Sequence, residues 1–346
     1  MSSPCFASPL ADMAVIDVTG ADAAAFLHGQ LTHDIAGLAP NQARLAGYCT
    51  PKGRLLGSMV VWQARDAEAP ALRALIKADI ADTVAKRLSM FVLRAKASLA
   101  VTRPSIWGVT LDPGAKGSAA PAMDGSYPSL AEQAAKLPAD AAPWTIVRGD
   151  TGDWIAAPCA GTPSTRWWRV AHAPLEEQPA AASSAQAAAW QAADIAAGLP
   201  WVQAATQDVF IPQTLNLDLI DGVSFTKGCY PGQEVVARSH YRGTVKRRMA
   251  YGLIQDGTAT GPDAGVLAGT DVFDARQPDN PCGRIINAAR ADLDRPLDAS
   301  PSDTHPIHAL AEVQLADLGT ADFRLGSPDG PALSMRALPY AIVQNP

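Results

Sequence analysis

The residues best suited to chemistry lie in one short segment, Lys227 to Glu234, which reads Lys-Gly-Cys-Tyr-Pro-Gly-Gln-Glu. Cys229 follows Lys227 by two residues, and the stretch that begins at Gln233 is typical of the first turns of a helix. A helix N-terminus and a nearby ammonium group both favour a thiolate over a thiol. We therefore expect Cys229 to be a reactive thiol. The alternative is a buried cysteine that acts as a small hydrophobic side chain.

The other four cysteines are widely spaced: Cys5, Cys49, Cys159 and Cys282. None of the five cysteines forms a C-x-x-C pair. An odd number at such spacings argues against a disulfide framework and against a preformed tetrahedral zinc site. We expect free thiols in a reducing cytoplasm and no metal site. Cys49 is the main rival of Cys229 for reactivity, because it lies beside the Lys52-Gly53-Arg54 turn.

The densest basic run of the chain follows the cysteine segment and contains Arg238, Arg242, Lys246, Arg247 and Arg248. The first three would share one helix face, but Gly243 argues against an unbroken helix. The run predicts an anion site for a glutamate tail, a phosphate or an RNA backbone. The alternative is a solvated surface stripe.

The elements that must position these residues are read from hydrophobic spacing and from turn residues. Alternating or continuous apolar runs predict strands over residues 13–18, 43–49, 55–62 and 92–101. Helical spacing and Ala-rich composition predict helices over residues 22–31, 76–91 and 184–197. The Pro and Gly of Thr50–Arg54 make that segment a turn between two strands.

The chain has 346 residues, 48% of them hydrophobic, and a formal net charge of −6. This length predicts two or three domains, and the composition excludes a disordered, collagen-like or coiled-coil protein. The acidic balance argues against general nucleic-acid binding. We expect no membrane span and no secretory signal, hence a cytoplasmic protein. Beyond Lys246, the last lysine, short apolar runs between Gly, Pro and Asp predict a small all-β module.

The segment Lys227–Glu234 resembles the K-G-C-Y-x-G-Q-E signature of the YgfZ family, folate-binding proteins linked to iron–sulfur enzymes and tRNA modification. That family is related to the glycine-cleavage T-protein. Four further segments resemble family motifs in register: Phe26–Asp34 (F-L-x-G-Q-x-T-x-D), Cys49–Arg54 (C-x-x-K-G-[KR]), Trp190–Pro200 (W-x-x-x-x-I-x-A-G-x-P) and Phe210–Gln213 (F-I-P-Q).

The resemblance implies an α+β fold like that of the T-protein. Residues 1–248 would form two interleaved α+β domains around a central folate cavity, and residues 249–346 a C-terminal β-barrel. Trp190 falls where family members stack an aromatic ring on the pterin, although it could equally be a core anchor of its helix. Met13 falls where some members carry a second tryptophan.

The resemblance also implies a set of site residues. Those expected to act with Cys229 are Lys227, Gln233 and Glu234. Those expected to bind a tetrahydrofolate derivative are Met13, Trp190, Tyr230, Arg238 and Arg242.

The first functional hypothesis is a folate-dependent accessory factor for iron–sulfur cluster assembly or repair, which would thereby support tRNA modification. Its partners would be iron–sulfur enzymes or assembly proteins. One cysteine cannot hold a stable cluster, which normally takes four thiolates. The alternative is a T-protein-like transferase of one-carbon groups, but Gly57-Ser58 carries no carboxylate where T-proteins place a catalytic aspartate, unless Asp17 or Asp34 substitutes. A direct tRNA-binding module is the third and least expected hypothesis.

Overall fold

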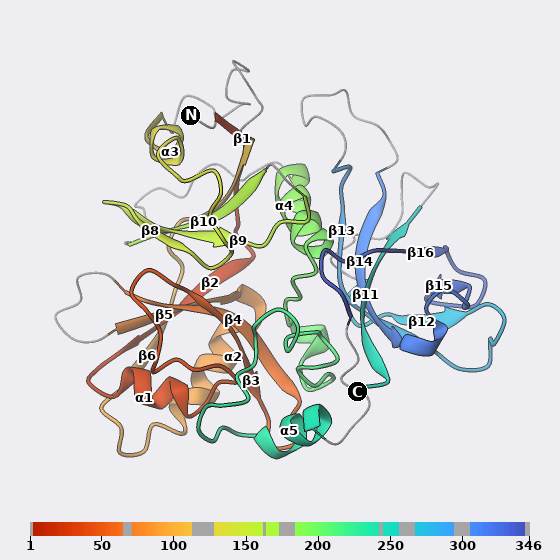
Figure 1. The fold of residues 1–346 in the computed structure, drawn as a ribbon, viewed down its shortest axis with the longest axis horizontal. Coiled ribbons are helices and arrows are strands. Elements are labelled where there is room, and N and C mark those ends of the chain that lie inside the picture. Colours follow the sequence, from red (N-terminus) through yellow and green to blue (C-terminus); the bar gives the residue numbers. More distant parts are fainter. Residues whose placement is uncertain are drawn as a thin grey trace.

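Three β-sheets dominate the structure, a computed structural model of the chain (Figure 1). It describes residues 3–64, 71–112, 128–161, 164–172, 184–241, 245–255, 267–293 and 305–342. Two of the sheets have five strands and carry the helices of the first two-thirds of the chain, and the third has six strands. No helix among the described residues is long and apolar enough to cross a membrane. The predicted α+β class is confirmed.

The first sheet is antiparallel, in the order β3-β4-β5-β2-β6. Its strands are β2 (Met13–Thr19), β3 (Arg44–Cys49), β4 (Leu55–Gln63), β5 (Ala71–Lys77) and β6 (Ser98–Thr102). Two helices accompany it, α1 (Ala23–His28) and α2 (Ala78–Ser89). The apolar face of α2, with Ile80, Val84 and Leu88, is buried, which is why this amphipathic segment packs as a helix.

The second sheet has the order β1-β7-β10-β9-β8. Its strands are β1 (Ser3–Pro9), β7 (Ile106–Asp112), β8 (Ile146–Arg148), β9 (Gly152–Ala157) and β10 (Thr165–Ala171), with the helices α3 (Pro128–Ala134) and α4 (Ser184–Ala196). Because β1 pairs with β7, the first strand of the chain belongs to the second sheet. The two α+β halves are therefore interleaved along the chain.

The third sheet has the order β15-β12-β13-β14-β11-β16. Its strands are β11 (Arg247–Ile254), β12 (Asp271–Asp274), β13 (Gly283–Arg290), β14 (Ile307–Gln314), β15 (Phe323–Leu325) and β16 (Leu333–Arg336). A bridge between Arg324 and Ala332 brings the two outer strands together, so the sheet nearly closes into the predicted barrel. Helix α4 packs against β13 and β14. Short 3₁₀ turns lie at Ala204–Thr206 and Leu315–Asp317, and helix α5 (Gln233–Tyr241) precedes the barrel.

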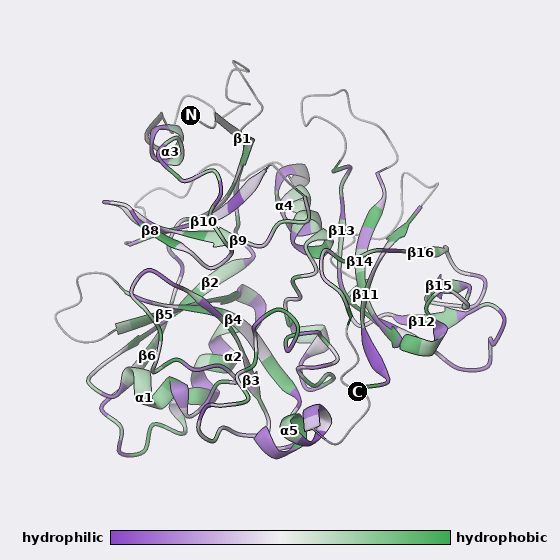
Figure 2. Ribbon diagram, viewed as in Figure 1, coloured by the Kyte–Doolittle hydropathy of each residue, from purple (hydrophilic) through white to green (hydrophobic). Residues whose placement is uncertain are grey.

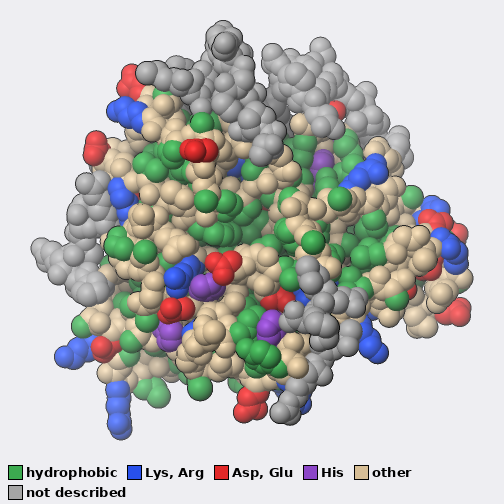
Figure 3. Space-filling view, in the orientation of Figure 1, with side chains coloured by type: hydrophobic (Ala, Val, Ile, Leu, Met, Phe, Trp, Pro, Cys, Tyr) green, Lys and Arg blue, Asp and Glu red, His purple; other side chains and the backbone are tan. Residues whose placement is uncertain are grey.

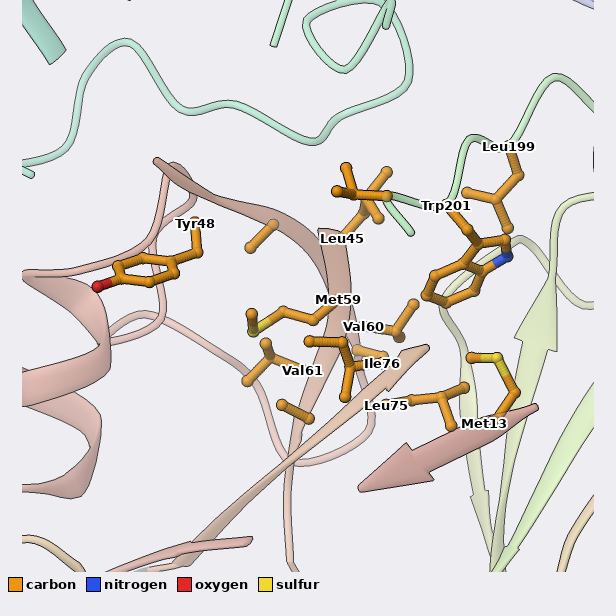
Figure 4. Close-up of a cluster of buried hydrophobic side chains, with 14 of the residues drawn as sticks. Met13, Leu45, Tyr48, Met59, Val60, Val61, Leu75, Ile76, Leu199 and Trp201 are labelled. Atoms are coloured by element: carbon orange, nitrogen blue, oxygen red, sulfur yellow. The ribbon is translucent and has the colours of Figure 1, made fainter. Parts of the chain in front are cut away.

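A cluster of tryptophans fills the space between the sheets. The Trp168 ring lies 6.2 Å from Trp144 and Trp190 and 6.1 Å from Trp201, centroid to centroid. Figure 4 shows Trp201 above Met13 of β2, beside Leu199. These rings bury a large apolar area in one place, so they tie the second sheet, α4 and the first sheet into one core.

A buried ion pair crosses this cluster. Arg166 Nη2 donates to Asp194 Oδ1 at 2.7 Å, and the two side chains are only 3% and 6% exposed. The other oxygen, Asp194 Oδ2, accepts from Trp201 Nε1 at 2.9 Å. Both carboxylate oxygens therefore have partners, which is what a buried charge requires.

Most predicted elements are confirmed. The strands predicted at 13–18, 43–49 and 55–62 are present, and the helix predicted at 184–197 is α4. The strand predicted at 92–101 is wrong over its first half, because Lys96 hydrogen-bonds through its backbone to Asp22 at the start of α1 instead of joining a ladder. The helix predicted from residue 76 begins at Ala78, since Ile76 and Lys77 end a strand.

Replacing Asp194 by Asn leaves the buried Arg166 guanidinium without a counter-charge. We expect this change to lower the free energy of unfolding by about 3–5 kcal/mol. The matched control, Asp82→Asn, breaks an exposed pair with Arg103 and should cost no more than about 1 kcal/mol. Urea denaturation of both variants measures the difference. Equal losses would show that the buried pair contributes no more than the exposed one.

Candidate functional site

The loop that carries Cys229 lies on the Thr50–Arg54 turn. The contact is made by two glycines with positive φ, Gly232 at +83° and Gly53 at +74°. A Cβ added to Gly232 would lie 2.5 Å from the Thr50 carbonyl oxygen and 2.6 Å from Gly53 Cα. Only glycine allows both this backbone conformation and this close approach. Two motifs that are about 180 residues apart in the sequence therefore meet backbone to backbone.

Helix α5 begins directly after this contact, as the sequence predicted. The backbone N–H groups of Val235 and Val236 donate to the Gly232 carbonyl at 3.1 and 3.2 Å. Val236 is buried, and its carbonyl accepts from Gln213 Nε2 at 2.6 Å, which holds the helix against the Phe210–Gln213 motif. Glu234 lies in the first turn, where a negative charge stabilises a helix. Figure 2 shows that α5 carries hydrophilic residues along much of its length.

The Cys229 side chain is exposed, and the other described cysteines are more protected. Cys49 is buried, and Cys159 and Cys282 are half-buried. Burial raises the pKa of the Cys49 thiol to about 12 and that of Cys282 to about 11. Cys49 lies beside a basic turn in the sequence, but its side chain points into the core below that turn. Cys49 is therefore expected to be much less reactive than Cys229.

Lys227 reaches back from the Cys229 loop to the end of α1. Its Nζ donates to the carbonyl of His28, and to that of Leu31 at 2.6 Å. A lysine at a helix C-terminus satisfies carbonyls that the helix leaves free. Burial lowers the pKa of Lys227 to about 8, against the opposing effect of the nearby Asp34 and Cys229.

His28 is the functional candidate that sequence reasoning missed. His28 Nδ1 lies 3.0 Å from Asp34 Oδ1, and a Cβ added to Gly228 would lie 3.7 Å from His28 Nε2. The carboxylate therefore orients the imidazole so that Nε2 faces the Cys229 loop. A hydrogen bond from the Gly37 N–H holds the pKa of Asp34 below its usual range. The histidine and the aspartate both stand in the Phe26–Asp34 motif, which was the available signal.

Tyr230 is buried beneath the loop, and burial raises its pKa. Its ring centroid lies 5.0 Å from Lys227 Nζ, within reach of a cation–π interaction. Gln233 is half-buried and Glu234 exposed in the first turn of α5. That Lys227, Gln233 and Glu234 act with Cys229 stays a prediction.

Two of the five cations in the basic run are held in ion pairs, and an anion site at Arg238 and Arg242 stays a prediction. Arg238 is exposed on α5, but the helix ends at Tyr241, and Arg242 lies outside the described residues. Arg248 is buried and makes two hydrogen bonds to the Asp218 carboxylate, at 2.8 and 2.9 Å. Arg247 pairs with Glu312 of the barrel. Arg248 therefore links the barrel to the rest of the chain, and Arg247 joins β11 to β14 within the barrel.

Met13 and Trp190 belong to the buried tryptophan cluster and not to the Cys229 edge. Trp190 is 2% exposed, and the Arg166 guanidinium carbon lies 4.0 Å from its ring centroid. A Cβ on Gly108 would overlap the indole, so the backbone of β7 lies against the ring. These contacts favour the core-anchor role, and stacking on a pterin stays a prediction.

The described hairpin carries no carboxylate at Gly57-Ser58, where the resemblance to T-proteins implies a catalytic aspartate. Ser58 is buried and its hydroxyl binds the backbone, donating to the Pro200 carbonyl at 3.3 Å and accepting from Val202 N–H at 3.0 Å. Asp17 is held by Arg73 on β5. Asp34 lies at the Cys229 edge, bonded to His28. In the described part of the chain, no group of three or more His, Cys, Asp or Glu side chains could hold a metal ion.

The glycine contact gives a direct test of the site's architecture. Gly232→Ala forces a methyl group into the Thr50–Gly53 backbone, and we expect it to cost about 1–3 kcal/mol more than Gly319→Ala. Gly319 is a matched control, because its φ is +82° and no atom lies within 4 Å of an added Cβ. Thermal and urea unfolding report the two losses. Equal losses would mean that the close approach is not needed.

The exposure of Cys229 predicts the order of thiol reactivity. In the native protein at pH 7–8, we expect iodoacetamide to modify Cys229 faster than Cys282, and Cys49 last, because burial keeps the other two protonated. Mass spectrometry of peptides at timed intervals measures each rate. In urea the rates should converge, which controls for intrinsic differences. A native Cys282 that reacts as fast as Cys229 contradicts the prediction.

Comparison with known proteins agrees with this architecture. No family model matches the chain. The tRNA-modifying protein YgfZ of Edwardsiella ictaluri is 33% identical over 242 residues, covering 70% of this chain and 69% of that protein. The protein of the same name from Cronobacter sakazakii is 32% identical over 247 residues. The structure of glycine cleavage system aminomethyltransferase T from Bartonella henselae aligns with a TM-score of 0.63 at 16% identity, covering 97% of this chain and 86% of that one, which shows the shared fold. At this identity and coverage of its relatives, the chain belongs to the YgfZ family.

Proposed function

We propose that this protein is a folate-binding accessory factor for iron–sulfur cluster assembly or repair, which thereby supports tRNA modification in the cytoplasm. The observation that carries the proposal is the meeting of three motifs around one exposed thiol. Gly232 seats the Cys229 loop on the Thr50–Arg54 turn, Lys227 caps α1, and His28 faces the loop. The relatives named tRNA-modifying protein YgfZ support the link to tRNA.

Cys229 would act as a redox-active thiol or a transient ligand toward a partner protein. Its exposure suits contact with another protein's cluster, since a buried thiol could not reach one. A single thiolate releases a cluster easily, because stable clusters normally need four. An accessory role fits this chemistry better than storage of iron.

The buried tryptophan cluster offers the chemical groups that a pterin ring needs. The indole N–H of Trp190 is buried and has no hydrogen-bond partner among the described residues, so it is a donor available to a ligand. Met13 lies beside Trp201 and supplies an apolar wall (Figure 4). Hydrophobic side chains also gather near the centre of the face drawn in Figure 3. A bound reduced folate would supply a carrier of one-carbon groups.

A T-protein-like transferase is the competing function. The shared fold supports it, but Ser58 and its neighbours carry no acid at the hairpin, and Asp34 is engaged with His28 at the thiol edge. These residues lack the acid–base partner that methylene transfer needs. The accessory role is therefore the better supported of the two.

Titration of the protein with tetrahydrofolate, followed by tryptophan fluorescence, tests folate binding. We expect quenching, and about fivefold weaker affinity in Trp190→Phe, which corresponds to about 1 kcal/mol of ring interaction. The control is Trp107→Phe, a buried tryptophan of a separate cluster, which should bind as the parent does. Equal affinity in Trp190→Phe would leave Trp190 as a core residue only. Failure of the parent to bind would remove folate from the proposal.

A second measurement separates the thiol role from transfer. In cells that lack their own family member, Cys229→Ser should fail to restore the activity of an iron–sulfur tRNA-modifying enzyme, while the purified variant still binds folate. Turnover of an aminomethylated carrier protein by the purified parent would instead support the transferase.

A further inference from the structure

A pocket of about 520 Å³ lies between the Thr50–Arg54 turn, α5 and the barrel. Its apolar surface comes from Val209 and Val235 on one side and from Pro281 on the barrel side. Pockets of this volume at the boundary between two structural units are the usual size and place for a ligand. Cys229 does not line it, although the pocket shares the Thr50–Arg54 turn with the Cys229 loop.

The charges of the pocket differ between its two walls. On the barrel wall, Arg247 pairs with Glu312, and Arg284 with Asp271 at 2.9 Å, so the barrel wall is close to neutral. On the turn wall, Lys52 has no acidic partner among the described residues, and neither has Arg54. The turn wall therefore carries two uncompensated positive charges.

The two walls also offer different hydrogen-bonding groups. Arg54 Nη1 donates to the carbonyls of Asp208 and Val209 at 3.2 and 2.9 Å, which fixes the guanidinium at the pocket edge. Both hydrogen bonds from Arg284 go to Asp271 Oδ1, which leaves Oδ2 to accept from a ligand. The pocket thus presents cations on one wall, an acceptor on the other and aliphatic side chains between them.

We propose that this pocket binds an acidic, aliphatic peptide segment of a partner protein. A ligand carboxylate would lie against Lys52 and Arg54, an aliphatic side chain against Val209 and Val235, and a backbone N–H would donate to Asp271. Opposite charges across such an interface give specificity and speed association. A phosphate ion fits less well, because it has no aliphatic part to contact Val209 and Val235 and no backbone N–H to donate to Asp271.

The partner protein that contains this peptide would be an iron–sulfur client or assembly protein. Only this identity rests on the proposed function. Binding in the pocket would place that partner on the flank of α5. The same helix begins at the loop that carries Cys229. Binding of a peptide here needs neither folate nor the thiol, so the two proposals can fail separately.

The test is a fluorescence-anisotropy survey of labelled octapeptides that combine glutamate or aspartate with leucine or valine, each matched by a peptide with the amides glutamine or asparagine. At low salt, we expect some acidic peptides to bind the full-length protein and their amide counterparts to bind about tenfold more weakly or not at all. Affinity should fall as salt rises.

Substitutions of the exposed Lys52 remove or reverse one positive charge of the pocket. We expect Lys52→Gln to weaken binding about threefold and Lys52→Glu about tenfold or more. The control is Arg94→Glu, an exposed cation on the loop after α2 that does not line the pocket. Cys229→Ser should bind the peptides as the parent does.

Three outcomes would overturn the proposal. The first is that no acidic peptide binds better than its amide match, and the second is that Lys52→Glu and Arg94→Glu lose the same peptide affinity. The third is that inorganic phosphate displaces the peptide completely at a lower concentration than unlabelled peptide does. The last would identify a phosphate site instead.

Discussion

The approach of Gly232 to Gly53 is the contact on which the candidate site depends. It lets the Cys229 loop rest on the Thr50–Arg54 turn with no side chain between the two backbones. Helix α5 then starts at a fixed place, and Lys227 lies within reach of the carbonyls at the end of α1. The positions of the reactive side chains depend on this backbone contact, because no side-chain hydrogen bond among the described residues joins the loop to the turn.

The molecule separates an exposed reactive edge from a buried aromatic core. Cys229 stands in solvent, where its thiol can meet another protein, whereas Trp190 is enclosed by β7 and Arg166. The two regions share the first sheet: α1 and the Thr50–Arg54 turn belong to the edge, and Met13 of β2 belongs to the core. A ligand bound in the core would therefore not touch the thiol.

Local signals allowed most of the elements and the central motif to be predicted from the sequence. The Pro and Gly of residues 50–54 and the Ala-rich run of α4 are such signals, because neighbouring residues decide a turn or a helix. Strand β5 was missed because its apolar run continues into α2 without a break. The partners of Arg247 and Arg248 could not be predicted, since Glu312 and Asp218 are brought to them only by long-range packing. His28 was overlooked because its role depends on Gly228, which lies 200 residues further along the chain.

Strand β1 has a consequence for how the chain is made. It is synthesised about 100 residues before its partner β7, so its backbone groups lack that partner while the first sheet is made. An unpaired strand is a template for aggregation. Pro4 and Pro9 within β1 have no N–H to offer, and in the finished sheet this strand lies at the edge, where proline is tolerated. The same two residues leave the edge of the sheet with fewer N–H groups that another strand could pair with.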